Sequence, residues 1–75
     1  MKQIGEIIHD FEEQGLLVLA QGSGVLGISV PKKTPDGLTG DELANSFSEA
    51  INRYVTENKM KAGAIQIQYV VRAGE

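Results

Sequence analysis

Several residue types on which small proteins depend for chemistry are missing from this chain. It contains no cysteine, no tryptophan and a single histidine, His9. Without cysteine, neither a disulfide framework nor a thiolate metal site can form. His9 is followed by Asp10, but neighbouring residues on a helix do not face each other, and no nucleophile is evident beside them. We therefore expect a non-enzymatic protein with no catalytic residues, no cofactor and no metal.

Long hydrophobic runs are absent as well. The longest run of large apolar residues, Leu16–Leu19, is far too short to cross a bilayer, and the first residues lack the apolar region of a signal peptide. These two absences predict a cytoplasmic protein. The length of 75 residues leaves room for one domain, residues 1–75, with a core so small that oligomerisation would supplement its stability.

The chain also lacks an excess of basic residues, since its formal net charge is −3. Residues 1–15 hold one basic and four acidic side chains, whereas residues 16–75 hold six of each. This distribution argues against nucleic-acid binding that ignores sequence, because such binding draws its affinity from basic surfaces. A local basic patch is the remaining route to nucleic acid, and its candidates are Lys32, Lys33, Lys59, Lys61 and Arg72.

Two segments have the apolar spacing of amphipathic helices. The first begins near Ile4, and Gly15 is suited to end it. The second is predicted over residues 40–60, because Thr39 and Glu42 have the spacing of a capping box. Gly63 is expected to stop this second helix. Its inner face is expected to hold Leu43, Phe47, Ala50, Ile51, Tyr54 and Val55.

Three further segments, residues 16–20, 25–30 and 64–72, are predicted strands. The first two form a hairpin, and the first is expected to be buried. The helix that follows the hairpin should bring the last strand back beside the first. The predicted fold class is therefore α+β in the order α-β-β-α-β. Its antiparallel sheet has the strand order 2-1-3 and packs against two helices.

Two short motifs resemble chemical sites but have simpler explanations. Residues 22–27 match the G-x-G-x-x-G pattern of dinucleotide-binding proteins, but a strand follows where that motif needs a helix, which favours a hairpin turn. Glu6 and His9 have the Glu-x-x-His spacing of di-iron bundles, yet the chain has no second histidine for the other half of such a site. We interpret both as structural.

Two surfaces are candidates for binding a protein partner. Glu6, Asp10 and Glu13 form an acidic stripe on the first helix, suited to a basic partner or to the ordinary role of a solvated face. The last strand carries Gln66, Gln68 and Arg72 on a mixed face beside Val70, and we expect Leu16 and Val18 to extend that face. This strand could also be an open sheet edge that pairs with a partner or with a second copy.

The span from Gly24 to Asn58 resembles the strand–loop–helix of HicB-type antitoxins. It combines a strand that contains glycine and ends in Pro31 with a helix opened by Leu38-Thr39-Gly40-Asp41-Glu42. The resemblance covers less than half of the chain, and we transfer no functional residues from it. It implies the alternative function, a nucleic-acid-associated regulator or antitoxin-like dimer.

The favoured function is a small acidic protein–protein interaction module. One concrete form is an accessory regulator or inhibitor, of the kind that phages and mobile elements encode, which occludes a surface of its partner. Such a protein needs no catalytic residues, in agreement with the inventory of this chain.

Overall fold

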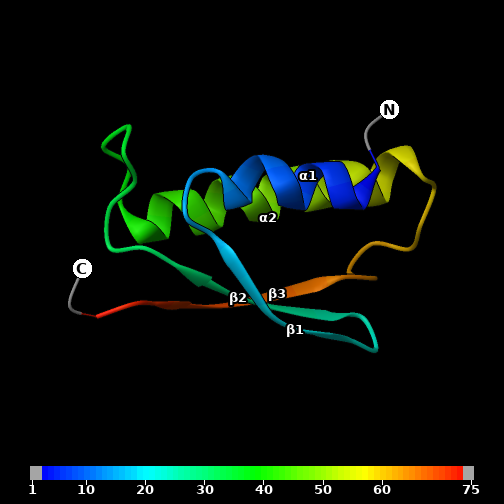
Figure 1. Ribbon diagram of the computed structural model, residues 1–75. Coiled ribbons are helices and arrows are strands. Elements are labelled where there is room, and N and C mark those ends of the chain that lie inside the picture. The colour runs from blue at the N-terminus through cyan, green and yellow to red at the C-terminus, as the bar shows by residue number, and fades with distance from the viewer. Residues whose placement is uncertain (1–2, 74–75) are drawn as a thin grey trace.

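Two helices lie on the same face of a three-stranded sheet and pack against each other (Figure 1). The computed structural model describes residues 3–73. In chain order the elements are α1 (Ile4–Glu12), β1 (Leu17–Gly22), β2 (Val25–Val30), α2 (Gly40–Glu57) and β3 (Gln66–Val71). This two-layer arrangement confirms the predicted α+β class.

The start of α2 is set by local hydrogen bonds. The Glu42 N–H donates to the Thr39 hydroxyl at 3.2 Å, and the Thr39 N–H donates to the Glu42 carboxylate at 2.9 Å. These two bonds are the predicted capping box, and they satisfy two backbone donors that the first helical turn would otherwise leave unpaired. The structure therefore confirms the boundary that the sequence indicated most clearly.

The end of α2 differs from the prediction, because the helix stops at Glu57 and Gly63 lies beyond it. The chain leaves the helix at Lys59, which adopts the left-handed φ of 56°. The Met60 N–H then donates to the Val55 carbonyl at 2.9 Å, as in a Schellman ending. A lysine occupies a position that favours glycine, so no sequence signal marked the stop.

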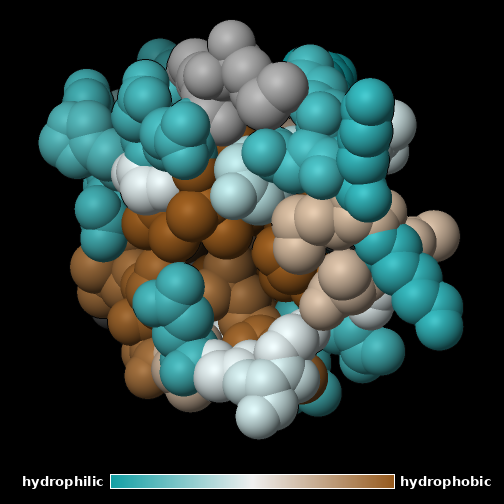
Figure 2. All heavy atoms as spheres, turned by 90° about the vertical axis from the view of Figure 1, so that its right-hand side faces the viewer, coloured by the Kyte–Doolittle hydropathy of each residue, from teal (hydrophilic) through white to brown (hydrophobic). Residues whose placement is uncertain are grey.

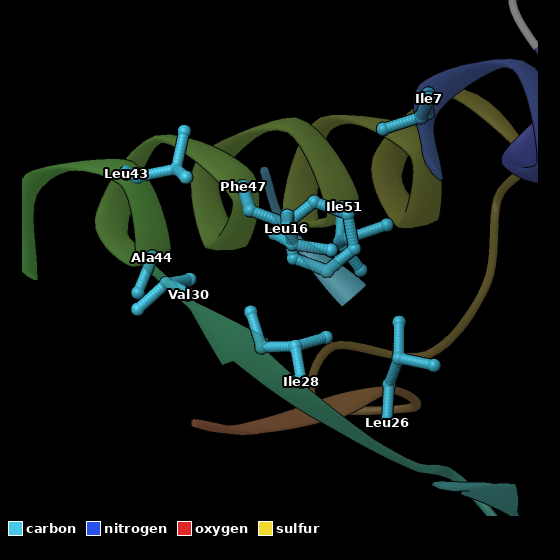
Figure 3. Close-up of a cluster of buried hydrophobic side chains, with 9 residues drawn as sticks. All are labelled: Ile7, Leu16, Leu26, Ile28, Val30, Leu43, Ala44, Phe47 and Ile51. Atoms are coloured by element: carbon cyan, nitrogen blue, oxygen red, sulfur yellow. The ribbon is translucent and has the colours of Figure 1, made fainter. Parts of the chain in front are cut away.

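The core lies between α2, α1 and the sheet (Figure 3). Side chains of α2 such as Phe47 point toward those of β2 such as Ile28, and Leu16 belongs to the same buried cluster. The rings of Phe11 and Phe47 meet edge to face, with centroids 5.2 Å apart. Each large side chain buried in this way contributes about 1.5–3 kcal/mol. The buried hydrophobic residues are Ile7, Leu16, Leu26, Ile28, Val30, Leu43, Ala44, Phe47, Ile51 and Val55.

The order of the strands contradicts the prediction. The sheet has the order β1-β2-β3, with β1 antiparallel and β3 parallel to the central β2, so both the order 2-1-3 and the fully antiparallel pairing are wrong. The direction of β3 is the same in both arrangements, because α2 returns the chain to the end of the sheet where β2 begins. The two arrangements differ only in the strand that β3 joins.

Two features explain why β3 joins β2 and not β1. The strand β1 is exposed along most of its length, contrary to the buried strand predicted there, and a bulge at Leu19 interrupts its regular pairing. In contrast, Gly24, directly before β2, permits a close approach. A Cβ atom at Gly24 would lie 2.9 Å from the carbonyl oxygen of Ala64, and the Gln66 N–H donates to the Gly24 carbonyl at 2.7 Å.

Candidate protein-binding surface

Because both helices cover one face of the sheet, the other face has no covering layer within residues 3–73 (Figure 1). We call it the open face. Leu17 on β1 and Val70 on β3 are 51% and 56% exposed there. Exposed apolar side chains with polar neighbours are typical of interaction surfaces. The open face consists of Leu17, Ala20, Val25, Gly27, Ser29, Gln66, Gln68 and Val70.

The residues that β1 contributes to the open face differ from those predicted. Leu16 precedes the strand and is fully buried in the core, and Val18 pairs with Ile28 on the helix side. Leu17 lies on the open face, where Leu16 and Val18 were expected. Successive residues of a strand point to opposite faces, so an error of one residue in the phase of a strand exchanges its faces. Gln66 and Gln68 do lie on the open face, as expected.

Arg72 is engaged within the chain and does not project freely. Its Nη1 donates to the Ser29 hydroxyl at 2.8 Å and to the Ser29 carbonyl at 3.2 Å, and its Nη2 donates to the Gly15 carbonyl at 2.8 Å. The side chain therefore crosses β2 and ties the end of β3 to the segment before β1. It also explains why Ser29, on the open face, is only 3% exposed.

The backbone of β3 leaves three residues with free hydrogen-bonding groups. The Gln66 N–H donates to the carbonyl of Gly24, directly before β2, at 2.7 Å, and the Arg72 N–H donates to the carbonyl of Val30 at 2.9 Å. Every second residue of β3 therefore bonds to β2. The N–H and C=O groups of Ile67, Tyr69 and Val71 therefore point away from the sheet. Across residues 3–73, no hydrogen bond involves these outward groups.

The two edges of the sheet differ in their readiness to pair. The sequence of β3 contains no charge, no proline and no glycine, and its register with β2 is regular over all six residues. The edge strand β1 has the bulge at Leu19, a feature by which natural sheets obstruct pairing with further strands. The edge of β3 is therefore the more competent template for a further strand.

A side-chain contact joins this edge to α2. The Tyr69 hydroxyl donates to the Asp41 carboxylate at 2.9 Å. The hydrogen bond and the negative charge of Asp41 raise the pKa of the Tyr69 phenol above its ordinary value of 10.0. No sequence pattern indicates this pair, because 28 residues separate its members and neither has a distinctive local pattern.

The acidic stripe on α1 is exposed, but its members have different surroundings. Glu6 accepts a hydrogen bond from the Gln3 N–H at 3.4 Å, near the start of the helix. Glu13 lies 3.2 Å from His9 in an exposed pair, which contributes little to stability. Asp10 lines a groove of about 360 Å³ between α1 and α2. One member of the stripe therefore borders a groove that the sequence did not predict.

Both apolar and charged side chains line the groove. Asp10 comes from α1, whereas Arg53 and Glu57 come from α2. A smaller hollow of about 230 Å³ lies at one end of the molecule, lined by residues that include Ile4, Val25 and Ile65. In the view of this end, apolar atoms reach the surface near the centre, with polar side chains above them (Figure 2). Neither cavity gathers groups suited to a particular chemistry.

The basic candidates lie at opposite ends of α2. Lys32 and Lys33 are beside its beginning, since the Gly40 N–H donates to the Lys32 carbonyl at 3.1 Å. Lys59 and Lys61 follow its last residue. A helix of 18 residues is about 27 Å long, so these two pairs do not form one local patch.

Comparison with protein-family models, curated proteins and solved structures finds no match for this chain. Within residues 3–73, no three His, Cys, Asp or Glu side chains gather where they could hold a metal ion. No helix in the same range combines the length and the apolarity needed to cross a membrane. The function therefore has to be inferred from the surface itself.

Proposed function

We propose that this chain is a small non-enzymatic module that binds proteins through the free edge of β3 and the adjoining open face. The observation that carries this proposal is the row of unbonded N–H and C=O groups on Ile67, Tyr69 and Val71. An extended segment of a partner can add to this edge as a further strand, with main-chain hydrogen bonds supplying the affinity.

The residues of β3 indicate which kind of partner segment can pair with its edge. Its edge carries no charge, and its side chains alternate between the helix side and the open face. On the helix side Ile67, Tyr69 and Val71 are accessible to different degrees, and on the open face Val70 is 56% exposed. The partner segment is therefore an extended, uncharged strand with apolar residues at alternate positions.

Binding at this edge is sufficient for an accessory regulator or inhibitor. Such a protein acts by occupying a surface of its partner, so it needs binding energy and no reacting group. The single histidine and the lack of cysteine are in keeping with this role. The acidic stripe of Glu6, Asp10 and Glu13 lies away from the β3 edge, so it would favour partners that also present a basic surface to α1.

The role of the acidic stripe can be tested separately from the edge. Replacing Glu6, Asp10 and Glu13 together by lysine should weaken binding to the partner. The loss of affinity should shrink as salt is added. Unchanged affinity would remove the stripe from the interface and leave the β3 edge as the binding surface.

A paired capture experiment tests the edge. Tyr69→Pro removes an outward N–H while sparing every bond between β3 and β2, whereas Tyr69→Val removes the same ring and keeps the N–H. Both variants and the unmodified chain serve as bait in lysate of the organism that encodes the chain. We expect a stoichiometric protein that Tyr69→Val retains and Tyr69→Pro loses.

Nuclease treatment of half of each sample distinguishes protein binding from the alternative function, a nucleic-acid-associated regulator. A partner retained after nuclease supports the protein-binding proposal. Recovery that disappears with nuclease would contradict it and favour the nucleic-acid-associated regulator, with Lys32 and Lys33 as the first residues to replace. Equal capture by Tyr69→Pro and Tyr69→Val would show that the β3 edge is not the binding surface.

A further inference from the structure

The free edge of β3 is matched by a second copy of the same strand. We propose that two copies of this chain pair antiparallel along β3, about a two-fold axis at Tyr69, and form one six-stranded sheet. The inference rests on the proposed function, because it identifies the strand that adds to the edge as β3 of the second copy.

The register follows from the backbone groups that are free. When Tyr69 lies opposite Tyr69 of the second copy, Ile67 lies opposite Val71, and every outward N–H and C=O of β3 gains a partner. Shifting the register by two residues in either direction would place one of these residues opposite a residue outside β3. The symmetric register is therefore the one that satisfies the whole edge.

The same register matches the side chains. On the helix side, the apolar Ile67 and Val71 become neighbours, and the two Tyr69 rings lie beside each other across the axis. On the open face, Gln68 lies opposite Val70 and Gln66 lies opposite Arg72. No residue of β3 itself carries a charge, so the pairing brings no like charges of this strand together.

The acidic excess of the chain lies away from the proposed axis. The excess of acidic residues lies within residues 1–15, and the remaining 60 residues hold equal numbers of acidic and basic side chains. The helix α1 leads directly into β1, which is the strand at the opposite edge of the sheet from β3. The acidic helices of two paired copies would therefore lie away from the axis.

The pairing closes at two copies. After β3 is paired, β1 is the outer edge on both sides of the combined sheet. Its bulge at Leu19 breaks the regular ladder that a further strand would need. A self-complementary contact of this kind is isologous and gives a closed dimer rather than a fibre. The dimer also joins the two open faces into one continuous surface.

Sedimentation equilibrium of the full chain tests the association. The interface is narrow, so measurements should cover about 1 μM to about 1 mM, where weak dimers become populated. We expect the mass to rise from 8.1 kDa toward twice that value with concentration. The dissociation constant of Tyr69→Pro should exceed that of Tyr69→Val by at least about tenfold, since both lack the ring and only the first lacks the outward N–H.

Cross-linking tests the register, and it benefits from the absence of native cysteine. Residues 68 and 70 form a closely spaced pair across the proposed axis, with Cα atoms about 4.5 Å apart, within the range that a disulfide spans. A mixture of Gln68→Cys and Val70→Cys chains should form a disulfide-linked heterodimer on mild oxidation. Each variant alone is the matched control and should form far less linked dimer.

Each result either supports or overturns the inference. A monomer at every concentration, a dimer equally strong in Tyr69→Pro and Tyr69→Val, or cross-linking by one variant alone would overturn it. A monomeric chain that nevertheless captures a partner dependent on the Tyr69 N–H would overturn only the dimer and leave the proposed function standing. Mixed cross-linking together with the tenfold difference would support the dimer.

Discussion

The guanidinium of Arg72 donates a hydrogen bond to the carbonyl of Gly15 at 2.8 Å, although 57 residues separate them in the chain. The same side chain holds both the hydroxyl and the carbonyl of Ser29. It therefore connects the end of β3, the central strand and the segment that precedes β1. One side chain lying over the sheet therefore supports the order of the three strands at this end.

Replacing Arg72 tests its structural role. Arg72→Ala removes these charge-assisted bonds and uncovers Ser29, so we expect the free energy of unfolding to fall by about 2 kcal/mol. Urea denaturation followed by circular dichroism measures the change. Arg72→Lys keeps the charge but not the forked geometry and should recover only part of the loss. A fall below about 0.5 kcal/mol for Arg72→Ala would contradict a stabilising role.

The Tyr69–Asp41 bond should affect stability at alkaline pH. The pKa of Tyr69 is raised in the folded chain, so the bond stabilises the fold below the ordinary tyrosine pKa of 10.0. That contribution is lost as the pH rises through the raised pKa, where the phenol ionises beside the carboxylate. Asp41→Asn should lower the pKa of Tyr69 toward its ordinary value.

Absorbance titration of the phenol measures this shift. A Tyr54→Phe background isolates Tyr69, because the chain has only two tyrosines. The titration is compared between that background and the same chain with Asp41→Asn. An identical tyrosine pKa in both proteins would show that the Asp41 contact is not formed in solution.

The end of α2 offers a stabilising substitution. Lys59 has a φ of 56°, a conformation that costs an L-residue energy and that glycine adopts freely. We expect Lys59→Gly to raise the free energy of unfolding by about 0.5–1 kcal/mol, measured by thermal and urea unfolding. Lys61→Gly is the matched control, which removes the same charge without relieving a positive φ. Equal effects of the two substitutions would contradict the explanation.

The beginning of α2 offers the opposite case. A Cβ atom on Gly40 would lie 2.6 Å from the carbonyl oxygen of Pro31, a contact that the backbone must move to relieve. Gly40→Ala should therefore destabilise the chain by about 1–3 kcal/mol. Gly5→Ala is the control, because that position has open space and lies within α1, where alanine favours the helix. A neutral Gly40→Ala would contradict the close packing of α2 on the sheet.

The elements that the sequence predicted well are those fixed by neighbouring residues. Thr39 and Glu42 determine the start of α2 through bonds within one helical turn, and their spacing alone was sufficient. The same holds for the hairpin of β1 and β2, whose turn includes Gly24. Local chemistry of this kind is present in the sequence and needs no knowledge of the rest of the fold.

The sheet order could not be obtained in this way, because it depends on contacts between distant segments. Gly24 admits the carbonyl of Ala64, and Gly40 admits that of Pro31, yet a glycine in a sequence does not show which segment will approach it. The alternation of β3 correctly placed Gln66 and Gln68 on the uncovered face. It gave no indication that Arg72 would be engaged by Ser29 and Gly15.

Residue-resolved amide hydrogen exchange tests the central claim most directly, the claim that the outward edge of β3 is the binding surface. In the dilute chain, the amides of Ile67, Tyr69 and Val71 should exchange rapidly, while those of Gln68 and Val70, bonded to β2, are protected. In a complex verified by its mass, whether with a captured partner or with a second copy, the three outward amides should slow by at least about tenfold. Outward amides that are already protected in the dilute chain, or that still exchange rapidly in the complex, would contradict the account.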